Sequence, residues 1–208
     1  EELGPVNLTA IEEFERVQER HVFLSGQRND LLMAKETLHE AIKEMDGEMT
    51  ARFNETFMNI KSQFKEVFRE LFGGGQADLV LIDPNNLLET GIEIVAQPPG
   101  KKLQSLSLLS GGERALTAIA LLFAILNTRP VPFCILDEVE AALDESNVIR
   151  YSEYLKKYSK ETQFIVITHR KGTMEGADVL YGITMQESGV SKLVSVKLEE
   201  DVPVAKGV

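Results

Sequence analysis

The sequence predicts an α/β domain that carries a long helix on its N-terminal side. Apolar residues repeat every seven positions between Phe14 and Met49, which is the spacing of a coiled-coil helix. In the rest of the chain, short apolar segments alternate with helical segments, which is typical of a sheet with flanking helices. We therefore divide the chain into a coiled-coil arm and neck helix at residues 1–72, an α/β lobe at 73–200 and a flexible tail at 201–208.

The composition limits the classes of protein that the chain can represent. A net charge of −11 argues against a surface formed mainly by a nucleic-acid groove, so any contact with DNA must be local. The one cysteine, Cys134, falls in a predicted buried strand and cannot form an intramolecular disulfide, which fits a reducing cytoplasm. No segment is long and apolar enough to span a membrane, so we expect no membrane partner. Because the chain opens at Glu1 without an initiator Met, we expect it to be a piece of a longer protein.

The predicted arm begins near Ala10, because Thr9 and Glu12 form a capping box there. One row of the heptad seam is apolar throughout and consists of Val17, Leu24, Leu31, Leu38 and Met45. The alternate row is partly polar or charged and consists of Phe14, His21, Arg28, Lys35, Ile42 and Met49. An ordinary amphipathic helix is the alternative, but the sustained period favours a coiled coil whose partner helix is not in this sequence.

After Met49 the apolar spacing changes, which predicts that the supercoil ends. The apolar residues of this neck segment are Phe53, Phe57, Ile60, Phe64, Val67, Phe68 and Leu71. Because the segment is rich in aromatic residues, we expect it to pack onto a globular body. The triplet Gly73-Gly74-Gly75 should then end the helix.

The predicted lobe contains strands, two main helices and a terminal hairpin. Strands are expected at 78–83, 91–96, 132–136 and 163–168, with the hairpin strands at 180–186 and 192–198. One helix should run from Arg114 to about Leu126, and Asp144 can cap a second. The polar face of the second helix carries Lys156, Lys157 and Lys160. Such a cluster is most often a solvated surface, and a DNA contact is the alternative that we keep open.

The start of the first helix has the features of an anion site, in the stretch Leu109-Ser110-Gly111-Gly112-Glu113. Ser110 and Glu113 form a capping box, so backbone N–H groups should point out of the first turn. The two glycines lack Cβ atoms, so a phosphate can approach those N–H groups in the positive field of the helix dipole. Taken alone, such a stretch is more often a capped core helix. The apolar run 115–126 that follows predicts a buried helix, and this favours a ligand site at its start.

Two strand ends present further polar groups. Asp137 and Glu138 follow the apolar strand at 132–136, and His169 follows the strand at 163–168. In α/β proteins, ligands bind in the crevice beyond the carboxyl ends of the strands. Two adjacent acids can simply add solubility, but the end of a buried strand is a costly place for two charges without a cation.

These motifs resemble those of a known family. The stretch at 109–113 resembles the signature motif of ATP-binding-cassette (ABC) ATPases, and the segment Asp137-Glu-Val-Glu-Ala-Ala-Leu-Asp144 resembles the Walker B end and D-loop of bacterial structural-maintenance-of-chromosomes (SMC) proteins. The resemblance covers residues from Gly73 to about Glu200. It implies the C-terminal lobe of an ABC-type ATPase head, with a P-loop NTPase-like sheet and flanking helices, joined to a coiled-coil neck.

The resemblance also implies a role for each motif residue. Glu138 would position and polarise the attacking water, His169 would reach the γ-phosphate and Asp144 would be the D-loop aspartate. Asp137 would help to hold Mg²⁺ through water. Residues 109–113 would contact ATP that is bound by a second head. The implied cofactors are thus ATP and Mg²⁺.

One part of an ATPase is missing from the sequence, because no G-x-x-x-x-G-K-[ST] phosphate loop occurs in it. The resemblance implies that an N-terminal lobe of the same full-length protein supplies this loop, so we expect the fragment alone to be inactive. It further implies a second head in a homodimer, a kleisin subunit at the neck and at the outer face of the lobe, DNA, and a place on the bacterial chromosome in the cytoplasm. The expected function is ATP hydrolysis coupled to DNA entrapment or translocation, and so to chromosome condensation and segregation. A related ATPase of DNA double-strand-break repair and a non-catalytic scaffolding lobe are the alternatives.

Overall fold

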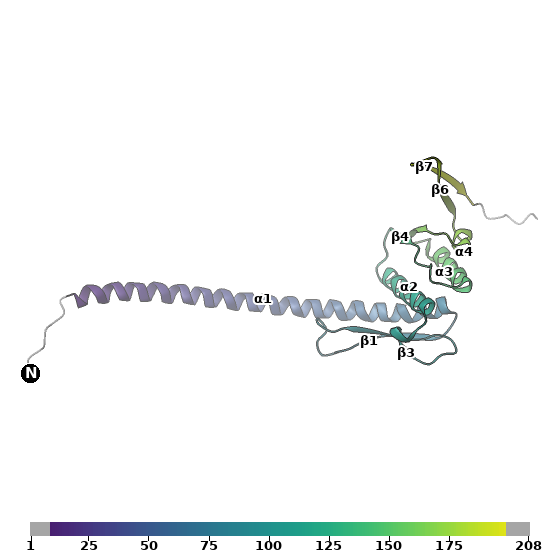
Figure 1. The fold of residues 1–208 in the computed structure, drawn as a ribbon. Helices are drawn as coiled ribbons and strands as arrows, with labels where there is room; N and C mark the ends of the chain where they lie inside the picture. The colour runs from purple at the N-terminus through teal and green to yellow at the C-terminus, as the bar shows by residue number, and fades with distance from the viewer. Residues whose placement is uncertain (1–8, 199–208) are drawn as a thin grey trace, which may run out of the picture. The chain divides into compact units, whose positions relative to one another are not determined.

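The computed structural model describes residues 9–198, which fall into two compact units that meet between Phe53 and Asn54. Helix α1 (Ala10–Phe72) begins in the first unit and ends in the second (Figure 1). Its start confirms the predicted start of the arm. Among the described residues, no helix is both long enough and apolar enough to cross a lipid bilayer.

The described part of the first unit is formed by the N-terminal part of α1, whose predicted seam lies open to solvent. Exposed seam residues include Phe14, Val17, Leu24, Leu31, Leu38, Ile42, Met45 and Met49. Leu31 is the extreme case, with 72% of its surface exposed. No described residue buries this apolar row. This part of α1 therefore gains little stability from packing within the described chain.

The second unit is built on the last turns of α1, as the aromatic neck segment predicts. The residues of α1 that are buried in this unit are Phe57, Phe64, Val67, Phe68, Leu71 and Phe72. Lys61 and Lys65 each form an ion pair with Asp78 of strand β1 (Gln76–Leu81), at 3.1 and 3.3 Å. The sheet that contains β1 therefore lies along this end of the helix (Figure 1).

The glycine triplet ends α1 as predicted, and all three glycines have positive φ. A Cβ atom on Gly75 would lie 2.3 Å from the backbone oxygen of Gln97. The turn from α1 into β1 therefore requires glycine for its conformation and for its closeness to the neighbouring strand.

The strands form three small sheets rather than one. The first is antiparallel and joins β1, β2 (Ile92–Gln97) and β3 (Gln104–Ser105) in that order. The second pairs β4 (Phe133–Asp137) with β5 (Gln163–Ile167) in parallel, and the third is the hairpin of β6 (Val179–Glu187) and β7 (Val190–Lys197). The short β3, the 3-10 turn at Leu106–Leu108 and helix α4 (Lys171–Glu175) have no counterpart among the predicted elements, because segments so short carry no periodic pattern.

Helices α2 (Gly111–Thr128) and α3 (Glu145–Tyr158) pack together around Phe123. The Phe123 ring lies 4.5 Å from that of Tyr154 and 6.1 Å from those of Tyr151 and Phe164, centroid to centroid. These contacts join α2, α3 and β5 into one core. The core positions the loops that follow β4 and β5.

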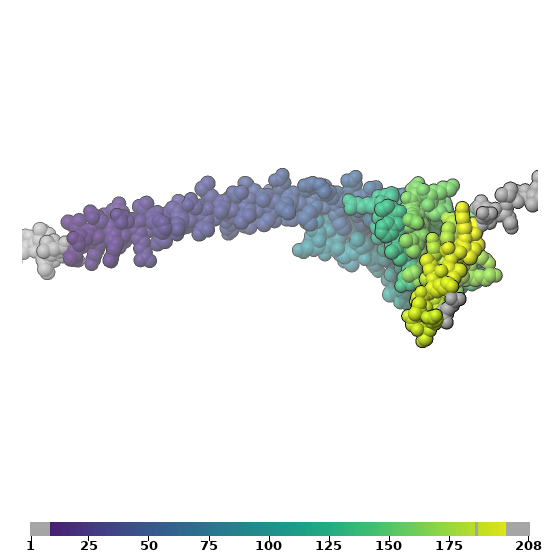
Figure 2. Space-filling model, turned by 90° about the horizontal axis from the view of Figure 1, so that it is seen from above, coloured from purple at the N-terminus to yellow at the C-terminus, as the bar shows by residue number. Residues whose placement is uncertain are grey.

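The prediction of fully buried strands and of a helix buried on nearly every face is wrong in part. Alternate residues of β4 and β5 are exposed, namely Phe133, Ile135, Ile165 and Ile167, and Ile125 of α2 is also exposed. Cys134 is half-buried. The reason is that side chains alternate across a strand, so the helices cover one face of this sheet and leave the other open. The β6–β7 hairpin, yellow in Figure 2, likewise carries exposed apolar residues along both strands.

Candidate functional site

The predicted capping box at the start of α2 is present. Ser110 is the N-cap in extended conformation, and its Oγ accepts a hydrogen bond from the Glu113 N–H at 3.4 Å. In return, Oε2 of Glu113 accepts from the backbone N–H of Ser110 at 3.0 Å and from its hydroxyl at 2.7 Å. Leu109 is buried beside the cap and anchors it.

Lys101 completes the polar cluster at this helix start. Its Nζ lies 2.8 and 2.9 Å from the two carboxylate oxygens of Glu113. The hydrogen bond from Lys101 lowers the pKa of the Glu113 carboxyl, the donors of Ser110 act in the same direction, and desolvation opposes both. Glu113 is thus held as a carboxylate that caps the helix.

The two glycines of the cap have different surroundings. A Cβ atom on Gly112 would lie 3.1 Å from the backbone oxygen of Ala142, so the start of α2 lies against the loop that follows β4. A Cβ atom on Gly111 would meet nothing within 4 Å. The backbone at Gly111 is therefore open to an approaching ligand.

The ends of β4 and β5 bring two predicted catalytic residues together. Because the strands are parallel and pair Asp137 with Ile167, the residues that follow them leave the sheet at the same edge. The N–H of Glu138 donates to the backbone oxygen of Ile167 at 3.0 Å, and Glu138 has a φ of 48°. Its Oε1 lies 3.3 Å from Nδ1 of His169, and both side chains are more than half exposed. A non-glycine residue in this left-handed region is held there by its surroundings and is frequent at functional sites.

Asp144 has a structural role in this state. Its Oδ1 accepts from the Asn147 backbone N–H at 2.9 Å and its Oδ2 from the Asn147 side-chain amide at 3.1 Å. It is thus the N-cap of α3, which was one of its two predicted roles. Its role as a D-loop aspartate stays a prediction.

The exposed carboxylate of Asp137 stands at the end of β4. Among residues 9–198, no three His, Cys, Asp or Glu side chains gather as a metal-binding group. Mg²⁺ usually keeps several waters and takes one or two protein carboxylates together with substrate phosphates. An exposed carboxylate such as that of Asp137 fits the implied ion, which it would help to hold through water.

Sequence reasoning assigned no role to Glu140, which is nearly fully buried at 1% exposure between the two loops. Its Oε1 accepts from the hydroxyls of Thr168 and Thr173. The signal in the sequence was an acid within the apolar run Val139 to Leu143. A buried acid in such a run needs partners that only the folded chain supplies.

The three lysines that the sequence places on the polar face of the second helix are not equivalent. Nζ of Lys157 lies 2.7 Å from Oε1 of Glu70 in α1, and this bond raises the pKa of Lys157. Lys157 therefore links α3 to the neck. Lys156 is exposed on α3. Lys160 is also exposed, but it lies in the turn after the helix ends at Tyr158, so its predicted place on the helix face is wrong. The DNA contact stays a prediction for all three lysines.

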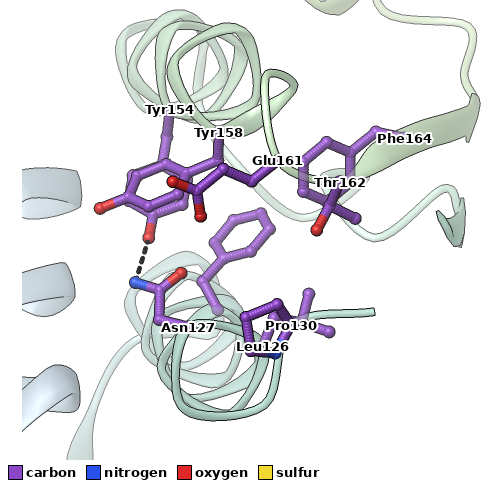
Figure 3. Close-up of a pocket in the computed structure, with 9 residues that line it drawn as sticks. Leu126, Asn127, Pro130, Tyr154, Tyr158, Glu161, Thr162 and Phe164 are labelled. Carbon is purple, nitrogen blue, oxygen red and sulfur yellow. Dashed lines mark hydrogen bonds between the residues drawn. The ribbon is translucent and has the colours of Figure 1, made fainter. Parts of the chain in front are cut away.

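The pocket in Figure 3 is not a substrate site. It is lined by Phe123, Leu126, Asn127, Pro130, Tyr154, Tyr158, Glu161, Thr162 and Phe164. The Asn127 amide donates to the Tyr154 hydroxyl at 3.1 Å (Figure 3). The pocket has a volume of about 20 Å³, which is room for about one water molecule. None of its lining residues belongs to the predicted site.

Comparison with known proteins gives one consistent result. The family model described as RecF/RecN/SMC N terminal domain matches residues 13–192. Chromosome partition protein Smc of Bacillus subtilis (strain 168) is 74% identical over 200 residues, which are 96% of this chain and 17% of that protein. The protein of the same name from Desulfitobacterium hafniense (strain Y51) is 64% identical over 197 residues, which are 95% of this chain and 16% of that protein. The chain thus spans 17% or less of the length of these two relatives.

Solved structures of SMC heads are similar in both sequence and fold. The Smc head domain with a coiled coil and joint from Pyrococcus yayanosii is 42% identical with a TM-score of 0.72, over 93% of this chain and 37% of that one. The Smc head domain of Pyrococcus furiosus, with an extended coiled coil and bound to the C-terminal domain of ScpA, is 42% identical with a TM-score of 0.71, over 90% of this chain and 47% of that one. A structure from work on ATP-driven dimerization and DNA-stimulated activation of SMC ATPases is 44% identical with a TM-score of 0.67, over 71% of this chain and 89% of that one.

Proposed function

The chain belongs to the RecF/RecN/SMC family, and we propose that it is the C-terminal lobe of an SMC ATPase head together with its coiled-coil neck. The matching family model is described as an N-terminal domain, and by itself it does not support the C-terminal lobe. Two features of the sequence support the C-terminal lobe: the signature motif, the Walker B acids and His169 occur in that order, and the phosphate loop is missing. The function that follows is ATP hydrolysis between two heads, coupled to the organisation of DNA in chromosomes.

The observation that carries this proposal is the contact of 3.3 Å between Glu138 and His169 at adjacent strand ends. A carboxylate in this place can accept the proton of a water that attacks the γ-phosphate. His169 orients that carboxylate and can donate to the phosphoryl oxygens. Bound Mg²⁺ would neutralise phosphate charge, and Asp137 is the residue that would hold it.

The start of α2 supports a role across the interface of two heads. The open backbone at Gly111 and the hydroxyl of Ser110 are suited to a phosphate that arrives from outside this chain. In the absence of a second head, that hydroxyl donates to Glu113. We infer that it changes partner when a second head, with ATP, closes on the motif.

The partners follow from the same assignment. The exposed apolar face of β4 and β5 offers a surface to the lobe that carries the phosphate loop. Similar heads are bound to domains of ScpA, so we propose a kleisin subunit at the neck and at the outer face of this lobe, with DNA as the further partner.

Two alternative functions can be weighed against this proposal. A scaffolding lobe would not need the left-handed backbone of Glu138 beside His169, and the similar proteins from Bacillus subtilis and Desulfitobacterium hafniense are chromosome partition proteins rather than repair ATPases.

Two substitutions in a complete head test the assignment of roles. Glu138→Gln keeps the size of the side chain and removes the base, so it should leave ATP-dependent dimerisation intact and slow hydrolysis by at least ~10²-fold. Ser110→Arg places a long cation where the backbone must approach a phosphate, so these heads should bind ATP and fail to dimerise. Sedimentation with ATP separates the two variants. Monomeric Glu138→Gln heads, or Ser110→Arg heads that dimerise normally, would contradict the roles assigned to these two residues.

A further inference from the structure

Glu140 is a buried carboxylate for which the hydrolysis chemistry has no direct use. It follows the exposed Glu138 by two residues, yet only 1% of it is exposed. Its Oε1 accepts from the Thr168 hydroxyl and from the Thr173 hydroxyl, the latter at 3.2 Å. Its Oε2 has no hydrogen-bond partner within the described part of the chain. A buried acid that is only half satisfied is unfavourable for stability, so its presence calls for another explanation.

The bond to Thr168 acts on the segment that carries His169. Thr168 directly precedes His169, and its hydroxyl also accepts from the backbone N–H of Arg170 at 3.0 Å. A threonine hydroxyl has one proton to donate and lone pairs to accept. Because Glu140 takes the proton, the lone pair faces Arg170. The residues on both sides of His169 are thus fixed through one hydroxyl whose orientation Glu140 sets.

Three further bonds tie the loop after β4 to the same segment. The Arg170 guanidinium donates through Nη2 to the backbone oxygens of Ala141 and Leu143, each at 2.8 Å. The Glu138 N–H donates to the backbone oxygen of Ile167 at 3.0 Å. These bonds lie before and after Glu140 in the chain, so Glu138 and His169 belong to one hydrogen-bonded unit with Glu140 at its buried centre.

We propose that Glu140 is a positioning residue that holds Glu138 and His169 in the relative placement that hydrolysis requires. It does so by orienting the Thr168 hydroxyl and by anchoring α4 through Thr173. The proposal rests on the proposed ATPase function for its consequence in catalysis. Its structural consequence, a fixed segment around His169, can be measured without ATP.

The catalytic test uses the complete head. Glu140→Leu removes the acceptor of both hydroxyls, and it should lower kcat by ~10-fold or more while the KM for ATP stays within ~2-fold, because placement and not nucleotide binding is lost. Glu140→Gln retains an amide oxygen that can accept both bonds, so it should keep kcat within ~3-fold of the original. Thr168→Val should lower kcat in the same way as Glu140→Leu. Glu153→Leu, at an exposed glutamate of α3, is the matched control.

A double variant separates positioning from any other role. If Glu140 acts through Glu138, then Glu140→Leu should cost little more activity in a Glu138→Gln background, since variants of one unit are not additive. An equal and additional loss in that background would overturn the proposal. So would a rise in KM that matches the fall in kcat, or a failure of Glu140→Gln to retain activity.

The structural test uses amide hydrogen exchange on the 208-residue chain itself. Glu140→Leu and Thr168→Val should speed exchange in the peptide 166–172 relative to peptides from α2 and α3, and Glu140→Gln should not. Unchanged exchange at 166–172, or a uniform increase in all peptides, would refute the positioning role. If Glu140→Leu does not fold, Thr168→Val and Thr173→Val give the same readout. A complete head that fails to hydrolyse ATP would disprove the proposed function, whereas the exchange result would still decide the role of Glu140.

Discussion

Glu113 serves two neighbours, because it caps Ser110 and pairs with Lys101. These contacts stabilise the start of α2 and still allow the Ser110 hydroxyl to change its hydrogen-bond partner. The Ser110 hydroxyl has a partner in this state, but the partner is a partly solvated side chain and not a buried backbone group. A phosphate can replace such a partner at modest cost.

Removal of Lys101 should therefore have an effect that depends on pH. The folded-state pKa of Glu113 lies below its ordinary value near 4.5, so its stabilising contribution is present above that value and is lost as the pH falls through the folded pKa. Lys101→Ala should lower the free energy of unfolding by about 0.5–1 kcal/mol at pH 7 and by less at pH 3, since half of Lys101 is exposed and solvent screens the pair. Urea titration at both pH values measures this, with Lys102→Ala as the control. A loss that grows on acidification would refute it.

At the scale of elements, the two parts of the 63-residue helix α1 differ in how much packing stabilises them. Beyond Phe53 it is held by buried aromatic residues, and before Phe53 its apolar seam is exposed. Isolated helices owe most of their stability to packing. The arm therefore needs a partner helix, whereas the neck has its core within this chain.

The isolated segment 10–53 should be only marginally helical, and its helicity should rise with concentration as seams associate. Circular dichroism over a range of concentrations checks this. When a partner helix is present, Leu31→Ala should weaken the arm more than Met33→Ala, because the two residues are about equally exposed in this chain, at 72% and 71%, and only Leu31 lies in the seam. A stable helix that does not depend on concentration, or equal effects of the two substitutions, would contradict the coiled-coil assignment.

At the scale of the molecule, the lobe exposes apolar residues on the β4–β5 sheet and on the β6–β7 hairpin. Surfaces of this kind usually mark an interface. The same chain has no G-x-x-x-x-G-K-[ST] phosphate loop, so the ATPase function that we propose requires a second lobe, and the exposed apolar surfaces are where such a lobe could pack.

The purified chain should accordingly neither hydrolyse ATP nor bind it tightly. Mixing it with a lobe that carries a G-x-x-x-x-G-K-[ST] loop should produce turnover, because only then are phosphates held opposite Glu138 and His169. A phosphate-release assay of each lobe and of the mixture decides the question, with Glu138→Gln in the mixture as the control. Saturable turnover by this chain alone would mean that the phosphate site has been misplaced.

The sequence by itself determined the local features of this protein. The caps at Ser110 and Asp144, the start of α1 near Ala10 and the glycines that end it follow from neighbours in the chain, and each was predicted and found. The meeting of Glu138 and His169 was predictable only as far as two parallel strands place their ends at one edge. All of these depend on short-range geometry, which residue type and spacing encode directly.

Only the tertiary structure decided which side chains from distant segments contact each other and which faces stay exposed. It left one face of β4 and β5 open although every residue of β4 is apolar up to Asp137, and it paired Lys157 with Glu70. It also placed Glu140 against Thr168 and Thr173, which lie 28 and 33 residues away in the sequence. A buried acid and its partners satisfy each other only once the chain has folded, because the cost of burial and the bonds that offset it come from separate segments.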